Sequence, residues 1–311
     1  MSVDLTFDDD QKLIADEVEK LCRDRADEAT VKAAAGAFPR ELWSVLGDAG
    51  FLALGAPGGE GGAQELLAAL EPLGRAVFPG PIVDTVLALQ LVDEPTRDGL
   101  IEGQRICSSG TGPLMPFAEQ ADLFLLIEDD GVYAAEKKGD VEPVQTLGGE
   151  PWGRVQLMRG ERFVRSERAL SLADLALSAY LTGAAQGLLA ACAEHVGTRK
   201  QFGRAIGSFQ AVAHPLADCH MALGAAQKLA RAAAVLWDAR DEQARGMAAA
   251  ARISSRRAAL NAAYTCHQKF GAIGITLEGP AHHVTRRIRQ LASRAPAVSV
   301  HHESVLSHFG V

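Results

Sequence analysis

The sequence lacks the features of a secreted, disulfide-bonded or zinc-binding protein. Its five cysteines are odd in number and widely spaced, and no two of them form a Cys-x-x-Cys pair. The first residues, MSVDLTFDDDQK, are acidic and contain neither the basic nor the apolar region of a secretory signal. We therefore expect a reducing, cytoplasmic environment and no disulfide framework.

Positive charge and long apolar runs are also scarce. The chain has 31 lysines and arginines against 39 aspartates and glutamates, a net charge of −8, so it lacks the basic surface that binds nucleic acid. No uncharged apolar run approaches the roughly 20 residues that span a bilayer. With 48% hydrophobic residues, the 311-residue chain has an ordinary globular composition and room for two or three packed subdomains.

Hydrophobic spacing predicts a mainly α-helical protein with a small β-rich insert. Apolar residues in the DQKLIADEVEKLCRDRADEA stretch and after Pro39 recur at helical spacing, which predicts an N-terminal helical domain over residues 1–103. In residues 104–167, two short apolar runs flank Asp129, Asp130 and Gly131, a signal for a β-hairpin in a reduced β-domain.

The remaining residues, 168–311, are alanine-rich and predict a bundle of helices. Along 212–238, apolar and small residues follow each other at steps of three and four: Leu216, Cys219, Leu223, Ala226, Ala230, Ala233 and Trp237. Such spacing indicates an antiparallel bundle seam in which helices approach closely. A further helix is expected over 244–270.

Several familiar catalytic patterns are missing. The glycine-rich segment 56–64 lacks the lysine and hydroxyl residue of a P-loop, which favours a plain connection between helices. The nine histidines lie between positions 195 and 308 without metal-ligand spacing, so we predict solvent-facing or interface histidines and no metal site. Neither a Gly-x-Ser-x-Gly turn nor a cysteine with a recognisable histidine partner supports hydrolase chemistry.

The strongest local signal is the segment 198–210, TRKQFGRAIGSFQ, which closes one predicted helix and opens the next. Arg199 and Lys200 can simply complement the helix dipole. Alternatively, the fork-shaped donors of Arg199 can clamp a pyrophosphate while the amide of Gln210 reads a base edge. Composition alone favours the first interpretation.

This segment resembles the R-x-x-F-G…F-Q signature of the acyl-CoA dehydrogenase family. A second segment, QKFGAIGIT (268–276) with Glu278 and Arg286, resembles the family's Q-x-x-G-G-x-G-x-x-x-E…R motif. The opening FDDDQKLIADEV and the segment 41–62 are similar to its N-terminal helical domain. The resemblance thus covers nearly the whole chain.

The resemblance implies a helical domain, a β-domain and a C-terminal four-helix bundle, with FAD bound at a dimer interface. In the family a glutamate removes the α-proton of an acyl-CoA and the β-hydrogen leaves as hydride to the flavin, which produces an enoyl-CoA. One subunit holds the flavin ring and the substrate, and its neighbour helps hold the pyrophosphate and adenine. The matching residues for this cofactor contact are Arg199, Gln201, Phe202, Gln210, Gln268 and Gly271. Ala272 replaces a glycine of the motif, and Glu278 with Arg286 matches a structural pair.

The chain departs from the family where its own flavin and substrate would lie. The Thr-Glu-Pro and Gly-Ser-Asp strings of the β-domain have no counterpart, and the segment 293–297, SRAPA, replaces the Tyr-Glu-Gly-Thr string that carries the usual base. The family's alternative base position aligns near Ala173. The neighbouring Asp174 is a weak catalytic candidate, because one step along a helix turns a side chain by about 100°.

This pattern resembles the short subunit of heteromeric acyl-CoA dehydrogenases of actinobacterial steroid and cholesterol catabolism. The resemblance implies an α2β2 heterotetramer with a second acyl-CoA dehydrogenase-like chain, a FAD shared across the interface, and an acyl-CoA bound mainly by the partner. It also implies an electron-transfer flavoprotein as acceptor. Two alternatives remain: a self-sufficient homomeric enzyme that uses Asp174 or an unrecognised carboxylate as base, and a structural or regulatory subunit without flavin contact.

Overall fold

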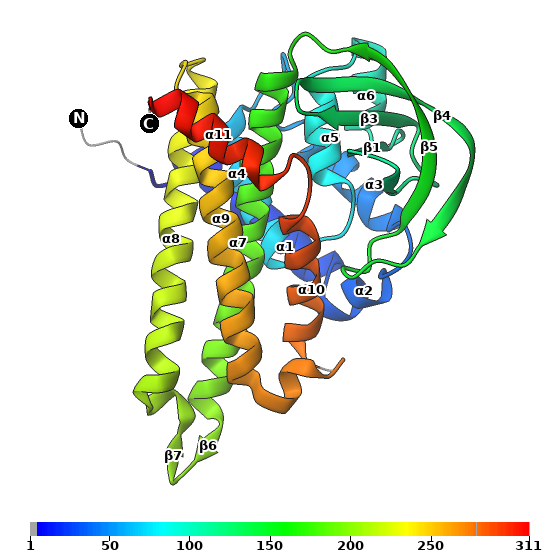
Figure 1. The fold of residues 1–311 in the computed structure, drawn as a ribbon. Coiled ribbons are helices and arrows are strands. Elements are labelled where there is room, and N and C mark those ends of the chain that lie inside the picture. The colour runs from blue at the N-terminus through cyan, green and yellow to red at the C-terminus, as the bar shows by residue number, and fades with distance from the viewer. Residues whose placement is uncertain (1–4, 278, 311) are drawn as a thin grey trace.

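The computed structural model describes residues 5–277 and 279–310 and shows long helices packed against a small β-sheet (Figure 1). The N-terminal part is helical, as predicted, and comprises α1 (Asp9–Arg25), α2 (Glu28–Ala33), α3 (Arg40–Asp48), η1 (Phe51–Ala53), α4 (Ala63–Arg75), α5 (Ile82–Leu89) and α6 (Glu94–Ile101). A capping box fixes the start of α1, where Asp8 Oδ1 accepts from the Gln11 amide at 2.9 Å. The helix expected after Pro39 is α3.

One five-stranded sheet follows, in the order β1-β3-β4-β5-β2. Its strands are β1 (Cys107–Gly110), β2 (Leu114–Pro116), β3 (Leu123–Glu128), β4 (Gly131–Val144) and β5 (Trp152–Arg162). The strands β1 and β3 run parallel, and the other neighbours are antiparallel. The predicted hairpin joins β3 to β4, with Glu128 opposite Gly131. The outer half of β4 is mostly exposed, so the sheet packs on the helices mainly through β1 and β3.

The C-terminal part contains the long helices α7 (Ser166–Thr198), α8 (Gln210–Asp238) and α9 (Ala244–Phe270), followed by α10 (Pro280–Ala292) and α11 (Val298–Phe309). Every residue of the predicted seam on α8 is buried. The most apolar stretch of α7 has a mean hydropathy of 1.4, enough for a membrane span, but 78% of it is buried inside the protein. We therefore interpret α7 as the central core helix.

A glycine lets α4 approach α7 closely. A Cβ atom added to Gly183 on α7 would lie 2.1 Å from the carbonyl oxygen of Glu71 on α4, a distance that no side chain tolerates. Because larger residues would force the two helices apart, this glycine fixes how the N-terminal helices dock on the bundle.

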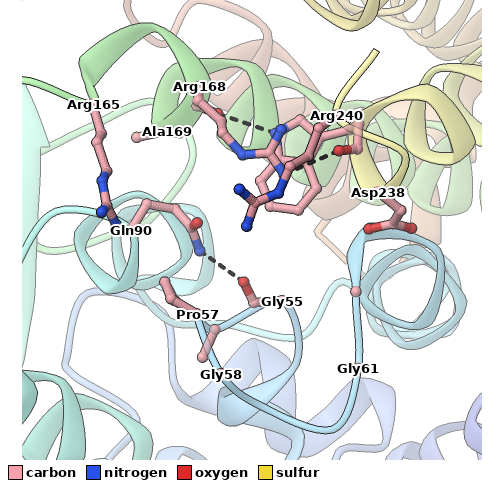
Figure 2. A pocket seen from close by; sticks show the side chains of 13 residues that line it. Gly55, Pro57, Gly58, Gly61, Gln90, Arg165, Arg168, Ala169, Asp238 and Arg240 are labelled. Atoms are coloured by element: carbon pink, nitrogen blue, oxygen red, sulfur yellow. Dashed lines mark hydrogen bonds between the residues drawn. The ribbon is translucent and has the colours of Figure 1, made fainter.

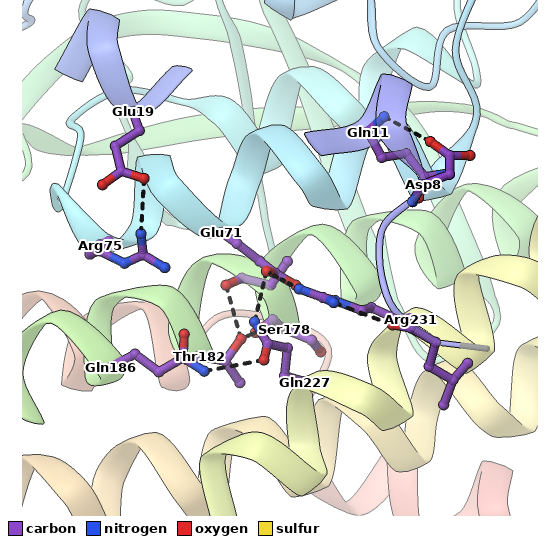
Figure 3. A network of polar contacts seen from close by, with 12 residues as sticks. Asp8, Gln11, Glu19, Glu71, Arg75, Ser178, Thr182, Gln186, Gln227 and Arg231 are labelled. Atoms are coloured by element: carbon purple, nitrogen blue, oxygen red, sulfur yellow. Dashed lines mark hydrogen bonds and ion pairs between the residues drawn. The ribbon is translucent and has the colours of Figure 1, made fainter. Parts of the chain in front are cut away.

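An ion pair, largely buried, joins α4 to another helix of the bundle, α8 (Figure 3). Glu71 on α4 accepts two hydrogen bonds from Arg231 on α8, at 2.9 and 2.6 Å, and a third from Gln227 at 2.7 Å. Arg231 also donates to the Leu5 carbonyl at 3.2 Å. Since 160 residues separate Glu71 from Arg231, the sequence pattern alone did not reveal this network.

Candidate functional site

The predicted cofactor residues lie in two connections at one end of the bundle, the lower end in Figure 1. The first joins α7 to α8 through β6 (Lys200–Gln201), β7 (Arg204–Ala205) and η2 (Ile206–Ser208); the second follows α9 as η3 (Gly271–Ile275). Lys269 Nζ donates to the Ala211 carbonyl at 2.8 Å, and the rings of His195 and Phe270 lie 5.1 Å apart. The fold thus joins two segments that are distant in sequence.

The tip of the first connection presents an aromatic ring to the solvent. Phe202 and Gly203 form the turn between β6 and β7, with φ angles of 51° and 80°. A phenylalanine rarely adopts this left-handed conformation, which costs about 1–3 kcal/mol. Its side chain is 93% exposed and meets Phe209 edge-on, with ring centroids 6.2 Å apart. The turn therefore holds the ring outside the bundle.

The other predicted residues are also exposed at this end of the bundle. The Arg199 amide caps α7 by donating to the His195 carbonyl at 2.9 Å, and the residue is exposed. Gln201 lies in β6, Gln210 begins α8 and Gln268 lies in the last turn of α9, all with exposed side chains. We call the six residues Arg199, Gln201, Phe202, Gln210, Gln268 and Gly271 the hairpin end.

Gly271 has a conformational role. Its φ of 65° and ψ of −134° are accessible essentially to glycine alone, whereas a Cβ atom there would meet nothing within 4 Å. Backbone conformation, and not crowding, therefore requires glycine at this position. Ala272, which replaces a glycine of the motif, is exposed in η3.

The hairpin end and the residues next to it combine positive charge with exposed apolar surface. Within residues 5–277 and 279–310, no carboxylate lies within 4 Å of the charged groups of Arg199, Lys200 or Arg204. Ile275, the last residue of η3, and Leu277, just beyond it, are 75% and 71% exposed. Isolated positive charges of this kind suit an anionic ligand, and the apolar side chains suit contact with another surface.

The predicted pair of Glu278 and Arg286 is only partly visible. Glu278 lies outside the described residues. Arg286, on α10, donates to the Leu147 carbonyl, and its Nη1 lies 3.1 Å from His282 Nε2.

The segment 293–297, expected where the family carries its base, joins α10 to α11. Arg294 from this segment is 8% exposed and forms a buried ion pair with Asp84 of α5, with Nη1 3.2 Å from Oδ2. Asp84 also accepts from the amide and the hydroxyl of Ser109 in β1, at 2.9 and 2.6 Å. Burial alone would lower the pKa of Arg294, but the neighbouring Asp84 raises it above its ordinary value. A structural ion pair therefore fills this position.

Asp174 contacts a histidine and an arginine on other helices. Its two oxygens lie 2.9 and 3.0 Å from His301 Nε2 on α11, and Arg252 Nε on α9 lies 3.7 Å away. Burial lowers the pKa of Arg252 to about 10, although Asp174 opposes that shift. The carboxylate thus joins α7, α9 and α11.

The histidine prediction was wrong at His301, which is 4% exposed and bonded to Asp174. An interior carboxylate supplies the partner that makes this burial favourable. His283 is also largely enclosed, and its burial, followed by the positive charge of Arg287, lowers its pKa to about 4. No group of three or more metal-ligating residues occurs in the described part of the chain.

Sequence reasoning missed the pair of Asp84 and Arg294. One signal was available, because Asp84 is the only charged residue in the apolar helix IVDTVLAL. A lone carboxylate among apolar residues usually has a cationic partner when the helix is buried.

Comparisons with known proteins agree with the fold. The acyl-CoA dehydrogenase N-terminal domain matches residues 8–92, and the acyl-CoA dehydrogenase C-terminal domain matches residues 163–293. The chain is 30% identical over 295 residues to the acyl-CoA dehydrogenase IpdE2 of Mycobacterium tuberculosis, covering 89% of this chain and 90% of that protein.

Two solved structures share the fold at 22% identity. A variant of the Tcur3481–Tcur3483 steroid ACAD superposes with a TM-score of 0.84 over 97% of this chain and 98% of its own. A chain of the ChsE4–ChsE5 complex from Mycobacterium tuberculosis superposes with a TM-score of 0.82 over 99% of this chain and 99% of its own length.

Proposed function

The chain belongs to the acyl-CoA dehydrogenase family, and we propose that it contributes the pyrophosphate and adenine half of a FAD site shared with a second, catalytic chain. One observation carries this proposal. The hairpin end lies at the opposite side of the molecule from the chain's own β-sheet (Figure 1). Because the family holds the flavin ring beside a β-domain, this separation supports a role of the hairpin end toward the cofactor of another chain.

The exposed groups of the hairpin end fit the non-flavin half of FAD. The Arg199 guanidinium offers paired donors to diphosphate oxygens without a competing carboxylate nearby in the described residues. The amides of Gln210 and Gln268 each offer a donor and an acceptor to a base edge. Phe202 provides an apolar ring that covers the ligand. When bound, FAD supplies the hydride acceptor for α,β-dehydrogenation of the acyl-CoA.

The catalytic half of the site is assigned to the partner. The segment 293–297 contains no carboxylate, and its arginine is committed to Asp84. We therefore propose that this chain lacks the catalytic base and that the partner binds most of the acyl-CoA.

We further propose that the chain forms an α2β2 heterotetramer with its partner in the cytoplasm. The proposed substrate carries a steroid-derived acyl group, and the proposed electron acceptor is an electron-transfer flavoprotein. Two structural neighbours, one named as a steroid ACAD and one as a complex of two differently named chains, support the assembly and the substrate class. The proposed domains are residues 1–103, 104–167 and 168–311.

We expect the chain to be colourless when it is produced and purified alone. Half a binding site leaves the flavin ring without contacts, so FAD is lost during purification. The absorbance of released flavin, measured against protein concentration, checks this result. A yellow homodimer with one FAD per chain would contradict the proposal.

A homomeric enzyme with Asp174 as base is the second candidate. It predicts a yellow, active protein whose activity falls when Asp174 is changed to asparagine. The pocket beside Asp174 encloses only about 120 Å³. Five carboxylates line it, namely Glu128, Asp129, Asp130, Glu167 and Asp174, whereas its basic side chains are Arg245 and His301. Such a pocket repels the phosphates of an acyl-CoA, which favours the shared site.

A further inference from the structure

A polar pocket, drawn in Figure 2, lies at the start of α7, whereas the hairpin end lies beyond the end of this helix. It encloses about 350 Å³ between the glycine-rich loop, the end of α5, the first turn of α7 and the end of α8. The helix α7 has 33 residues, so about 50 Å of helix separates this pocket from the hairpin end. The pocket is therefore a separate feature from the proposed FAD contact.

Three arginines converge on this pocket, which we call the arginine pocket: Arg165, Arg168 and Arg240. Arg168 is held in place, because its guanidinium lies 3.6 Å from the centre of the Trp237 ring and donates to the Trp237 carbonyl at 3.0 Å. Figure 2 shows Arg165 and Arg240 approaching from opposite sides. Among the described residues, neither has a carboxylate within 4 Å of its guanidinium.

The one carboxylate in the arginine pocket is already engaged. Asp238 accepts from the amides of Ala63 and Gln64, at 2.7 and 3.2 Å, and from the Gln64 side chain at 3.3 Å. Its charge therefore stabilises the N-terminus of α4. Burial, and to a smaller extent the nearby Arg240, lowers the pKa of Arg168. The effect of Arg240 shows that the clustered positive charges repel each other. A bound anion would relieve that repulsion.

We propose that the arginine pocket binds a small phosphorylated anion, with a diphosphate as the recognised group. Guanidinium groups pair with phosphate oxygens through two parallel hydrogen bonds, and three of them around one cavity offer enough donors for the oxygens of two linked phosphates. The volume is at the lower end of the range for small-molecule sites. The glycine-rich loop, expected from the sequence to be a plain connection, forms one wall, and the arginines supply the binding groups.

Calorimetric titration of the purified chain with pyrophosphate, and separately with ADP, tests the proposal. We expect saturable binding that weakens as salt is raised. Arg240→Ala and Arg165→Ala should each weaken it about tenfold or more, the effect of losing a hydrogen bond between charged groups. Arg168 is not substituted, because its packing on Trp237 contributes to folding.

An Arg199→Ala variant is the matched control, because the hairpin end is also cationic. Binding that survives Arg199→Ala and is lost with Arg240→Ala supports the arginine pocket. Tighter binding of ADP than of pyrophosphate identifies a nucleotide, and equal binding identifies the diphosphate alone. The proposal is overturned if neither compound binds, or if only Arg199→Ala abolishes binding.

Discussion

Replacing Arg199 with alanine is expected to lower the FAD affinity of the complex with the catalytic partner about a hundredfold. The guanidinium is exposed, and the described residues offer it no carboxylate within 4 Å, so its donors are available to the diphosphate. Hydrogen bonds between charged groups contribute about 1.5–3 kcal/mol each, and about 2.7 kcal/mol corresponds to a hundredfold change. Flavin fluorescence during titration of the apo-complex with FAD measures the effect.

Two further variants make the Arg199 result specific. Arg199→Lys keeps the charge but loses the paired geometry, so an intermediate affinity is expected. Arg257→Ala removes an exposed arginine of α9 outside the hairpin end and should leave FAD affinity unchanged. If Arg199→Ala retains flavin as well as the unmodified complex does, this chain is a structural subunit without cofactor contact.

Replacing Asp84 with alanine is expected to lower the free energy of unfolding by about 3–5 kcal/mol. Asp84 is 1% exposed, and its removal leaves the Arg294 guanidinium buried without a counter-ion. The substitution also removes the acceptor of two hydrogen bonds, which the Ser109 amide and hydroxyl donate to the carboxylate. Urea denaturation followed by circular dichroism should show a lower midpoint.

The double variant Asp84→Leu with Arg294→Met is the control for this stability effect. Apolar residues of similar size remove both charges together, so much of the lost stability should return. If Asp84→Ala unfolded at the same urea concentration as the unmodified protein, segment 293–297 would not be a packed structural element.

Much of the fold could be predicted from the sequence, because local periodicity determines it. The seam along α8 and the hairpin at Asp129, Asp130 and Gly131 follow from spacing and turn chemistry, and both were confirmed. Phe202 lies at the surface, and its role in cofactor contact stays a prediction.

The polar interior could not be predicted in the same way. The partners of Asp174 and Asp84 lie 127 and 210 residues away, and only the packing of α5, α7 and α11 brings them together. Periodicity shows which face of a helix is buried, but not which charged side chain a buried carboxylate will meet. For this reason His301 was expected at the surface and was found in the core.

The FAD content of the complex tests the shared site most directly. This chain should be co-expressed with a second acyl-CoA dehydrogenase-like chain as the candidate partner. Native mass spectrometry then gives the mass of the intact complex. We predict a tetramer of two unlike pairs that carries one FAD per pair. One FAD for every chain in that tetramer, or a flavin-loaded homodimer of this chain, would contradict the account.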